Sequence, residues 1–144
     1  MLREAIISDV PNIRALMQMV PGFWQPWWSE DTIAEAIRSA NGLAFVWEQG
    51  SQIVGFTCAH NLGFRAYLSE LVIDIRVRRQ GIGTRLVQAV EKDLRKRGQK
   101  ILIADVWRDS ESFYNSLGWS HPDAVLLRHR LSVEDGTSVT ECTG

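Results

Sequence analysis

The sequence predicts a single-domain α/β fold, an α+β arrangement in which a mixed sheet is flanked by helices. Strand-like and helix-like segments follow one another in the order β-α-α-β-β-β-α-β-α-β. A strand–helix–strand unit over residues 66–106 predicts a right-handed parallel crossover, whereas the hairpin before it predicts an antiparallel pair. With 144 residues, 45% of them hydrophobic and 23% charged, the chain can bury one core and is neither disordered, collagen-like nor a coiled coil.

The N-terminal part of the chain predicts a strand followed by a helix. Residues 2–7 are typical of a short strand. Asp9 can cap a helix that runs to about Met19, and Pro11 falls in its first turn, where a missing N–H costs little.

A second helix and a hairpin are expected next. Ser29 can cap a helix that ends near Asn41, because the following glycine favours a helix stop. Residues 43–48 and 53–60 are typical of strands, and the Gln-Gly-Ser turn over residues 49–51 joins them as a hairpin.

The crossover unit begins with a mostly apolar strand over residues 66–73. An amphipathic helix follows over residues 83–97, and Gly98 ends it. Residues 101–106 are apolar apart from Asp105, which predicts a strand buried on both faces.

The last expected elements are a short helix over residues 110–117, ended by Gly118, and a strand over residues 125–131. We expect the domain to cover residues 1–131 and a loose polar tail to follow over residues 132–144.

The charge of the chain is unevenly distributed. The net charge is −1, yet the stretch from Arg76 to Lys100 carries nine basic and two acidic residues, so the rest of the chain carries −8. This distribution indicates one site for an anionic ligand and argues against a general nucleic-acid-binding protein. Between Lys92 and Lys100 we favour a solvated helix face as the explanation.

The most informative stretch, Arg-Arg-Gln-Gly-Ile-Gly-Thr over residues 78–84, lies between the apolar strand and the amphipathic helix. Its two glycines, the flanking arginines and the start of a helix are suited to a pyrophosphate. The alternative is an ordinary glycine-rich turn. A Walker A loop is excluded because Gly83 is not followed by Lys, and a dinucleotide fingerprint is excluded because position 86 is Leu. The ligand that remains as a candidate for this loop is the diphosphate of another nucleotide carrier, such as coenzyme A.

Three motifs together resemble the GNAT superfamily of N-acetyltransferases. They are Glu70-Leu71-Val72-Ile73-Asp74 followed by Arg78-x-x-Gly81-x-Gly83, the later Ser112-Phe113-Tyr114-Asn115-Ser116-Leu117-Gly118-Trp119, and the hairpin strand Ile53-Val54-Gly55-Phe56. The resemblance extends over about residues 2–131 and implies a GNAT-like fold with a splayed central sheet. Many members of the family, especially those acting on peptide N-termini, carry Asn and Ala where this chain has Trp107 and Ser110. This difference weakens the hypothesis that the protein acts on peptide N-termini.

The resemblance implies transfer of an acetyl group from acetyl-CoA to a primary amine by direct attack in a ternary complex. Backbone groups of Leu71, Val72 and Ile73 would hold the pantetheine arm and the acetyl carbonyl, although these side chains could equally be plain core. The pyrophosphate would be held by the loop residues Arg78, Arg79, Gln80, Gly81, Ile82, Gly83 and Thr84.

Two residues are candidates for moving protons. The resemblance makes Tyr114 the general acid that protonates the leaving thiolate, whereas on residue type alone it would be a core aromatic. Glu70 is the candidate base, directly or through water; it could instead pair with an arginine or line an edge. Asp105 on the neighbouring strand is the second choice, and Asp74 is expected to shape the turn.

The loop between the first two helices is rich in tryptophan. Trp24, Trp27 and Trp28 would line an acceptor pocket if the loop serves as it does in the family, and their rings suit apolar or cationic amines. A hydrophobic plug and a dimer interface are the alternatives. We expect a small-molecule amine as acceptor; a protein lysine or N-terminus and a non-catalytic acyl-CoA-binding domain are the alternatives.

The sequence also predicts that the protein has no metal site and no membrane or nucleic-acid partner. His60, His121 and His129 have no metal-ligand spacing with one another or with Cys58, so no metal is expected. Two cysteines, no apolar leader and no membrane span favour the cytoplasm. We expect no nucleic-acid or membrane partner, and, since the family is often dimeric, a homodimer is one expectation.

Overall fold

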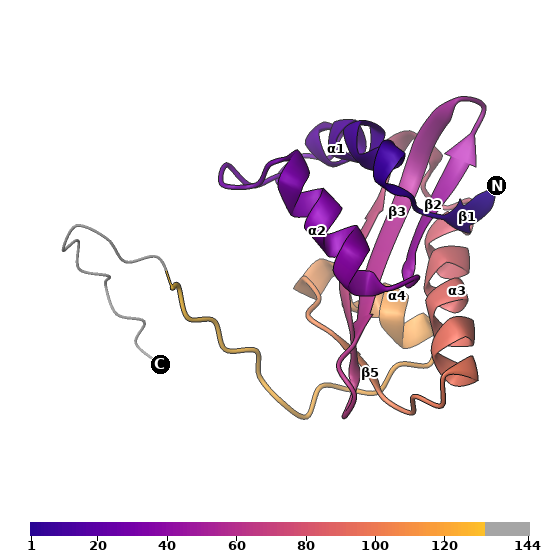
Figure 1. Cartoon of the computed structure of the whole chain (residues 1–144). Helices are drawn as coiled ribbons and strands as arrows, with labels where there is room; N and C mark the ends of the chain where they lie inside the picture. The colour runs from indigo at the N-terminus through magenta and orange to yellow at the C-terminus, as the bar shows by residue number, and fades with distance from the viewer. Residues whose placement is uncertain (132–144) are drawn as a thin grey trace. The chain divides into compact units, whose positions relative to one another are not determined.

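The computed structural model describes residues 1–131, and the expected tail over residues 132–144 lies outside them. The chain forms two compact units, Met1–Val106 and a second that begins at Trp107. The first unit carries the sheet and three of the helices, and the second carries a short helix (Figure 1).

The first unit is built on a five-stranded mixed sheet in the order β1-β2-β3-β4-β5. Its strands are β1 (Leu2–Glu4), β2 (Ala44–Gln49), β3 (Gln52–Asn61), β4 (Ala66–Ile73) and β5 (Leu102–Ala104). Neighbouring strands from β1 to β4 are antiparallel, and β4 and β5 are parallel. The expected hairpin and the expected parallel pairing of the crossover unit are therefore both confirmed.

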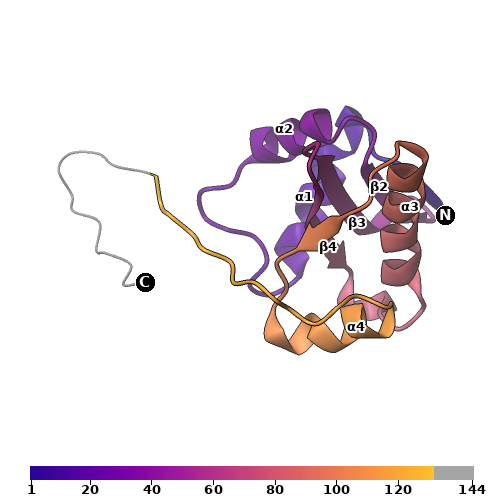
Figure 2. The same cartoon turned by 90° about the horizontal axis from the view of Figure 1, so that it is seen from below.

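Three helices flank this sheet. Helices α1 (Val10–Met19) and α2 (Glu30–Ala40) pack against β3, and α3 (Ile82–Lys96) packs against β2, β3 and β4. Figure 2 shows α1 and α2 on one face of the sheet and α3 on the other. The core between these layers is apolar because each helix turns one stripe toward the sheet. Its fully buried members include Ile13, Leu16, Leu43, Val46, Phe56, Leu86, Val87 and Val90.

The start of the chain differs in detail from the expected strand over residues 2–7. That strand ends at Glu4, and Ile7–Asp9 forms a 3-10 helix that leads into α1. The Asp9 carboxylate does not cap α1; it accepts a hydrogen bond from the Ile6 N–H at 2.8 Å and a bidentate pair from Arg3 at 2.9 Å. The carboxylate therefore joins β1 to α1.

Strand β5 is shorter and more open than expected. It spans Leu102–Ala104 rather than residues 101–106, and Ile101 and Ile103 are 52% and 43% exposed. The prediction of burial on both faces is wrong because, among the described residues, β5 is an edge strand with β4 as its only partner.

The second unit holds a 3-10 helix (Arg108–Ser110) and helix α4 (Glu111–Ser116), which stops before Gly118 as expected. The expected strand over residues 125–131 is wrong: these residues form no regular structure, and Val125 and Leu127 are more than four-fifths exposed. A segment with a strand-like sequence forms a strand only when a neighbouring strand supplies hydrogen-bond partners, and within the described residues no strand pairs with this segment. Among residues 1–131 no helix is long and apolar enough to cross a bilayer.

Candidate active site

The central feature of the site is a gap in the pairing of β4 with β5. The two strands pair from Ala66↔Leu102 to Leu68↔Ala104, and β4 then continues to Ile73 without β5 beside it. The expected splay of the sheet is thus confirmed. On the side of β4 that faces β5, the backbone groups beyond Leu68 have no partner on β5. They can therefore form hydrogen bonds with the polar groups of an extended ligand.

A one-residue bulge in β4 lies at the start of this gap. Cys58 of β3 is opposite Glu70, whereas Ala59 is opposite Leu68, so Ser69 is the extra residue. Because opposite residues share a face, Glu70 lies on the face of Cys58, whose thiol donates to the Ala36 carbonyl of α2. His60 is opposite Tyr67 and lies on this same face. The bulge therefore brings Tyr67 and Glu70, three residues apart, to one side of the sheet.

Glu70 is half-buried on this face. Burial and the negative charge of Asp105 raise the pKa of Glu70 to about 7. Among residues 1–131 no arginine or lysine forms an ion pair with Glu70, so the alternative of a structural pair is not what the structure shows. A carboxyl that changes charge near neutral pH is suited to accept a proton from an amine.

Asp105, the second-choice base, follows β5 directly and is exposed. Its carboxylate accepts a hydrogen bond from the Tyr67 hydroxyl. Neither Tyr67 nor Ser69 is among the site residues predicted from the sequence. The only available signal was the alternation of Ala66 and Leu68, which changes phase at the polar pair Ser69-Glu70.

A second polar group on this face surrounds His60. Its ring nitrogens lie 3.3 Å from Ser39 Oγ and 3.1 Å from Ser69 Oγ. The Ser69 hydroxyl also donates to the Cys58 carbonyl at 3.1 Å, which stabilises the bulge. Cys58 itself is buried and free, and burial raises the pKa of its thiol to about 12, which disfavours the thiolate form.

The turn between β4 and α3 is fixed by Asp74. This buried carboxylate accepts hydrogen bonds from the Arg76 N–H at 2.9 Å and the Arg76 guanidinium at 2.7 Å, and that guanidinium holds the pKa of Asp74 below its usual range. Asp74 thereby caps the 3-10 helix Ile75–Val77 and shapes the turn, as expected.

The glycine-rich loop leaves the start of α3 open. Gly81, with φ 81°, precedes α3, and no side chain caps the helix. Arg78 and Arg79 are exposed beside it, and a Cβ at Gly81 would meet no atom within 4 Å. Uncapped N–H groups, a positive helix end and two cations fit a pyrophosphate.

The side chains of the other expected cofactor residues divide by burial. Val72 and Ile82 are buried, and Leu71 and Ile73 pack against the cluster of Val54, Ile82 and Leu86. These side chains therefore belong to the core, which leaves their backbone groups for a ligand. Gln80 is exposed, and Gly83 and Thr84 are half-buried at the start of α3.

The tryptophan loop forms a small aromatic cluster. The rings of Trp24 and Trp28 meet edge to face at 5.6 Å, Phe23 meets Trp28 at 6.1 Å, and the Arg14 guanidinium lies over Trp24 at 5.4 Å. Trp27 is 69% exposed. Trp24 and Trp28 thus pack within the loop, whereas Trp27 presents its ring to solvent.

Tyr114 lies in the second unit, on α4. Its ring packs edge to face against Phe113 at 5.0 Å and Trp119 at 5.1 Å. The aromatic residues of the second motif therefore form one contiguous cluster around Tyr114.

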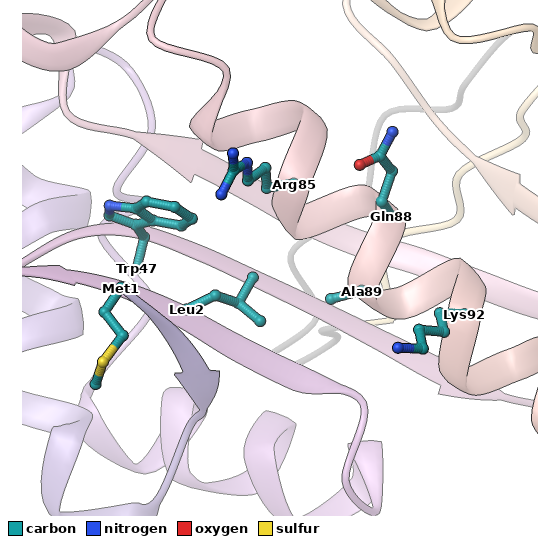
Figure 3. A pocket seen from close by; sticks show the side chains of 7 residues that line it. All are labelled: Met1, Leu2, Trp47, Arg85, Gln88, Ala89 and Lys92. Atoms are coloured by element: carbon teal, nitrogen blue, oxygen red, sulfur yellow. The ribbon is translucent and has the colours of Figure 1, made fainter.

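A pocket of about 470 Å³ lies elsewhere in the first unit, between β1, β2 and α3 (Figure 3). Trp47 and Leu2 form its apolar side, and Arg85 stands over the Trp47 ring at 5.7 Å. No residue expected at the active site lines this pocket. Among the described residues no cluster of metal-ligating side chains occurs.

The open strand edge, the half-buried Glu70 and the glycine loop are together suited to a diphosphate carrier held beside a carboxyl that can accept a proton. The profile of the acetyltransferase (GNAT) family matches residues 13–119. The chain belongs to this family and is an acetyltransferase. Comparison with curated protein sequences gives no significant match.

Solved structures share the fold. A PaiA N-acetyltransferase from Thermoplasma acidophilum, in complex with coenzyme A, is 18% identical over 87% of this chain and 92% of its own, with a TM-score of 0.74. The ribosomal-protein-S18-alanine N-acetyltransferase of Escherichia coli is 26% identical over 82% and 76%, with a TM-score of 0.71. Glucosamine-6-phosphate N-acetyltransferase of Arabidopsis thaliana is 17% identical over 92% and 98%, with a TM-score of 0.70.

Proposed function

We propose that this protein transfers the acetyl group of acetyl-CoA to the primary amine of a small molecule, by direct attack within a ternary complex. One observation carries the proposal. A half-buried carboxyl, Glu70, lies on β4 where β5 leaves the sheet, and its pKa is about 7. The gap supplies the place for a thioester, and the carboxyl supplies a base beside it.

In this reaction the amine nitrogen attacks the thioester carbonyl, a C–N bond forms and the C–S bond breaks. Glu70 takes the proton that the ammonium group loses, directly or through a water molecule. Backbone N–H groups of the stretch from Leu71 to Ile73 that point to the side of β4 without β5 stabilise the charge on the carbonyl oxygen. Holding the two reactants in register supplies much of the rate enhancement.

The departing thiolate needs a proton, and Tyr114 is the group we assign to donate it. A phenol with a usual pKa of about 10 can protonate a thiolate when the two are in contact. Its position in the second GNAT motif supports this role.

Acetyl-CoA binding is assigned to two segments of the first unit. The backbone of Leu71, Val72 and Ile73 runs along the open edge of β4 and can pair with the amide groups of the pantetheine arm. The loop from Arg78 to Thr84 offers N–H groups and cations to the pyrophosphate.

A small-molecule acceptor is supported by two features of the sequence. Trp107 and Ser110 replace the residues that peptide-acting members commonly carry. The exposed ring of Trp27 and the aromatic pair Trp24–Trp28 can line a pocket for an amine through cation–π contact. Relatives of this fold are named for amino sugars, aminoglycosides and a ribosomal protein, so the fold does not select among them. We place the activity in the cytoplasm and keep a homodimer as part of the proposal.

The first test is acetyl-CoA binding by calorimetry, with a melting curve beside it. At 100 times Kd the ligand adds about 2.7 kcal/mol, or roughly 5–11 °C in Tm for a chain of this length. Gly81→Ala should weaken binding at least tenfold. Gly63→Ala is the matched control, since Gly63 also has positive φ (86°) and open space around its Cβ but lies in the β3–β4 turn. Absence of binding by the unmodified chain would overturn the proposal.

A second experiment separates the enzyme from a non-catalytic acyl-CoA-binding domain. Thiol release from acetyl-CoA is followed with a panel of amines, using the unmodified chain, Glu70→Gln and Tyr114→Phe. Loss of turnover in both variants with acetyl-CoA binding retained supports the assigned roles. Binding without turnover by the unmodified chain, for every amine, would favour the binding domain.

A further inference from the structure

We propose that Asp105, held by the hydroxyl of Tyr67, is the residue that determines acceptor specificity, and that it selects amines whose remaining groups are cationic or neutral over amines that also carry a carboxylate or phosphate. This inference rests on the proposed function, because it assumes that the acceptor amine approaches Glu70. Its substrate class is a diamine, a polyamine or an unphosphorylated amino sugar.

The bulge at Ser69 supplies the geometry. In a regular strand Tyr67 and Glu70 would face opposite sides of the sheet, since they are three residues apart. The extra residue puts both on the face of Cys58 and His60. The Tyr67 hydroxyl donates to the Asp105 carboxylate, so the end of β5 and the face of β4 that carries Glu70 are joined at the point where the strands separate.

The position of Asp105 leaves it accessible to a ligand. The residue follows the last paired position of β5, Ala104, and is exposed. Its hydrogen bond with Tyr67 fixes one oxygen and limits the rotation of the carboxylate, which lowers the entropy lost on binding a partner. An anchored and exposed acceptor of this kind is suited to an N–H donor from a ligand.

The electrostatics of this face favour a cation. Neither Glu70 nor Asp105 has an ion-pair partner among residues 1–131. The negative charge of Asp105 raises the pKa of the Glu70 carboxyl, so the two carboxylates repel each other when both are ionised. A ligand ammonium would relieve this repulsion, whereas a ligand carboxylate would add to it.

The positive charge of the unit lies elsewhere. Arg78 and Arg79 are exposed in the glycine loop before α3, where the pyrophosphate is assigned. The donor therefore meets a cationic loop, and the acceptor meets an anionic pair. This division predicts that anionic amines are discriminated against at Asp105 rather than attracted by the arginines.

The test uses three acceptors of equal length: 1,4-diaminobutane, 4-amino-1-butanol and 4-aminobutanoate. Their far ends are positive, neutral and negative. The unmodified enzyme should show kcat/KM in that order, with a diamine-to-carboxylate ratio of at least about tenfold for charges about 6 Å apart. Asp105→Asn keeps the hydrogen bond acceptor for Tyr67 and should lower that ratio by about tenfold, and Asp105→Glu should restore part of it.

Two further variants separate specificity from structure. Asp93→Asn removes the same charge from α3, where Asp93 pairs with Arg97 at 3.5 Å, and should leave the ratio unchanged. Tyr67→Phe leaves the charge but frees the carboxylate, so it should raise KM for the diamine more than it lowers kcat. An unchanged ratio in Asp105→Asn, or a preference of the unmodified enzyme for 4-aminobutanoate, would overturn the proposal.

A readout without turnover distinguishes this inference from the proposed function. Calorimetry on the coenzyme-A-loaded protein measures binding of 1,4-diaminobutane and 4-aminobutanoate directly. Diamine binding that is weakened about tenfold in Asp105→Asn supports the inference even if no acetyl transfer is seen, in which case only the proposed function fails. Equal binding of the two ligands, or no diamine binding, overturns the inference. Either outcome leaves the proposed acetyl transfer to other amines standing, because the thiol-release assay tests it separately.

Discussion

Glu70 is a carboxyl whose surroundings set its proton affinity in the range that amine chemistry needs. It lies half-buried on β4, where burial and Asp105 both disfavour its charged form, and its pKa is about 7. An ordinary glutamate would be fully ionised at neutral pH and a weaker base.

This proton affinity predicts a pH profile. If Glu70 acts as the base, log kcat/KM should rise with slope near one up to about pH 7 and then level off, because only the ionised form accepts a proton. Glu70→Gln should lower kcat by about 10²–10⁴ and remove that inflection. A profile with the same inflection in Glu70→Gln would assign the titration to another group.

The same residue predicts a conflict between stability and activity. The folded pKa of Glu70 lies above its usual value of 4.5, so its contribution to stability is complete at low pH and is lost as the pH rises toward 7. Glu70→Gln should therefore increase the free energy of unfolding at pH 8, by up to about 3 kcal/mol, and change it little at pH 4. Urea denaturation at the two pH values measures this; a destabilised variant at pH 8 would contradict it.

Asp9 shows the opposite behaviour. Arg3 lowers the pKa of this carboxyl below its usual 3.8, so its stabilising contribution is present above that value and is lost as the pH falls below it. Asp9→Asn keeps an acceptor for the Ile6 N–H but loses the ion pair, and should cost about 2 kcal/mol at pH 7. The difference from the unmodified chain should shrink in urea titrations at pH 3. Asp31→Asn, in the exposed first turn of α2, is the control and should change stability little.

At the scale of elements, the approach of α3 to the sheet depends on one glycine in β3. A Cβ at Gly55 would lie 3.0 Å from side-chain carbons of Ile82 and Leu86 and 3.3 Å from Ile73. The glycine therefore lets the first turn of α3, which follows the glycine loop, lie close to β3, the neighbour of the strand β4 that holds the site. Local sequence gives no sign of this, since glycine in a strand is ordinarily unfavourable.

Gly55→Val should push α3 away from β3. We expect a loss of about 2 kcal/mol in the free energy of unfolding, typical of overpacked cores, together with weaker acetyl-CoA binding because the start of α3 moves. Gln52→Val, at the exposed beginning of the same strand, controls for β-propensity and should be neutral. Thermal denaturation and calorimetry measure the two effects, and unchanged melting of Gly55→Val would contradict the packing argument.

Most elements of the first unit could be predicted from periodicity and turn residues, because their patterns and their partners agree. The helix ended by Asn41, the hairpin turn and the parallel crossover all formed as expected. The strand over residues 125–131 did not form, since its pattern carries no information about a partner. The glycine loop and Glu70 could be identified from residue type and spacing, whereas the role of Tyr67 depends on a bulge that the sequence indicates only by a change of phase at Ser69-Glu70.

At the scale of the whole molecule, the charge is separated along the chain. The net charge of −1 is the sum of a basic stretch over residues 76–100 and an acidic remainder. The basic stretch contains the loop assigned to the pyrophosphate, so an anionic donor is drawn to one part of an otherwise acidic protein. The same separation argues against general nucleic-acid binding, which would need basic residues over a wide surface.

This separation predicts a salt effect. The association rate of acetyl-CoA should fall several-fold between about 20 and 300 mM NaCl, because the Debye length shortens from about 20 Å to less than 6 Å. S-acetylpantetheine, which lacks the pyrophosphate, is the control and should associate at a rate nearly independent of salt. Stopped-flow fluorescence of the six tryptophans can follow both ligands. Equal salt dependence of the two would show that the basic loop does not guide the donor.

The bulge at Ser69 also has a consequence for how this family member could change over time. Which side chains meet across the β4–β5 gap is set by the number of residues in β4, and not only by their identity. Deleting Ser69 would remove the bulge and leave Tyr67 and Glu70 two residues apart, still on one face of the sheet, whereas a strand of unchanged length without the bulge would turn Tyr67 to the opposite face. A change in the length of β4 and a change in its pairing therefore have different effects on the site, so relatives that differ in length at this position should be compared by register before they are compared by residue.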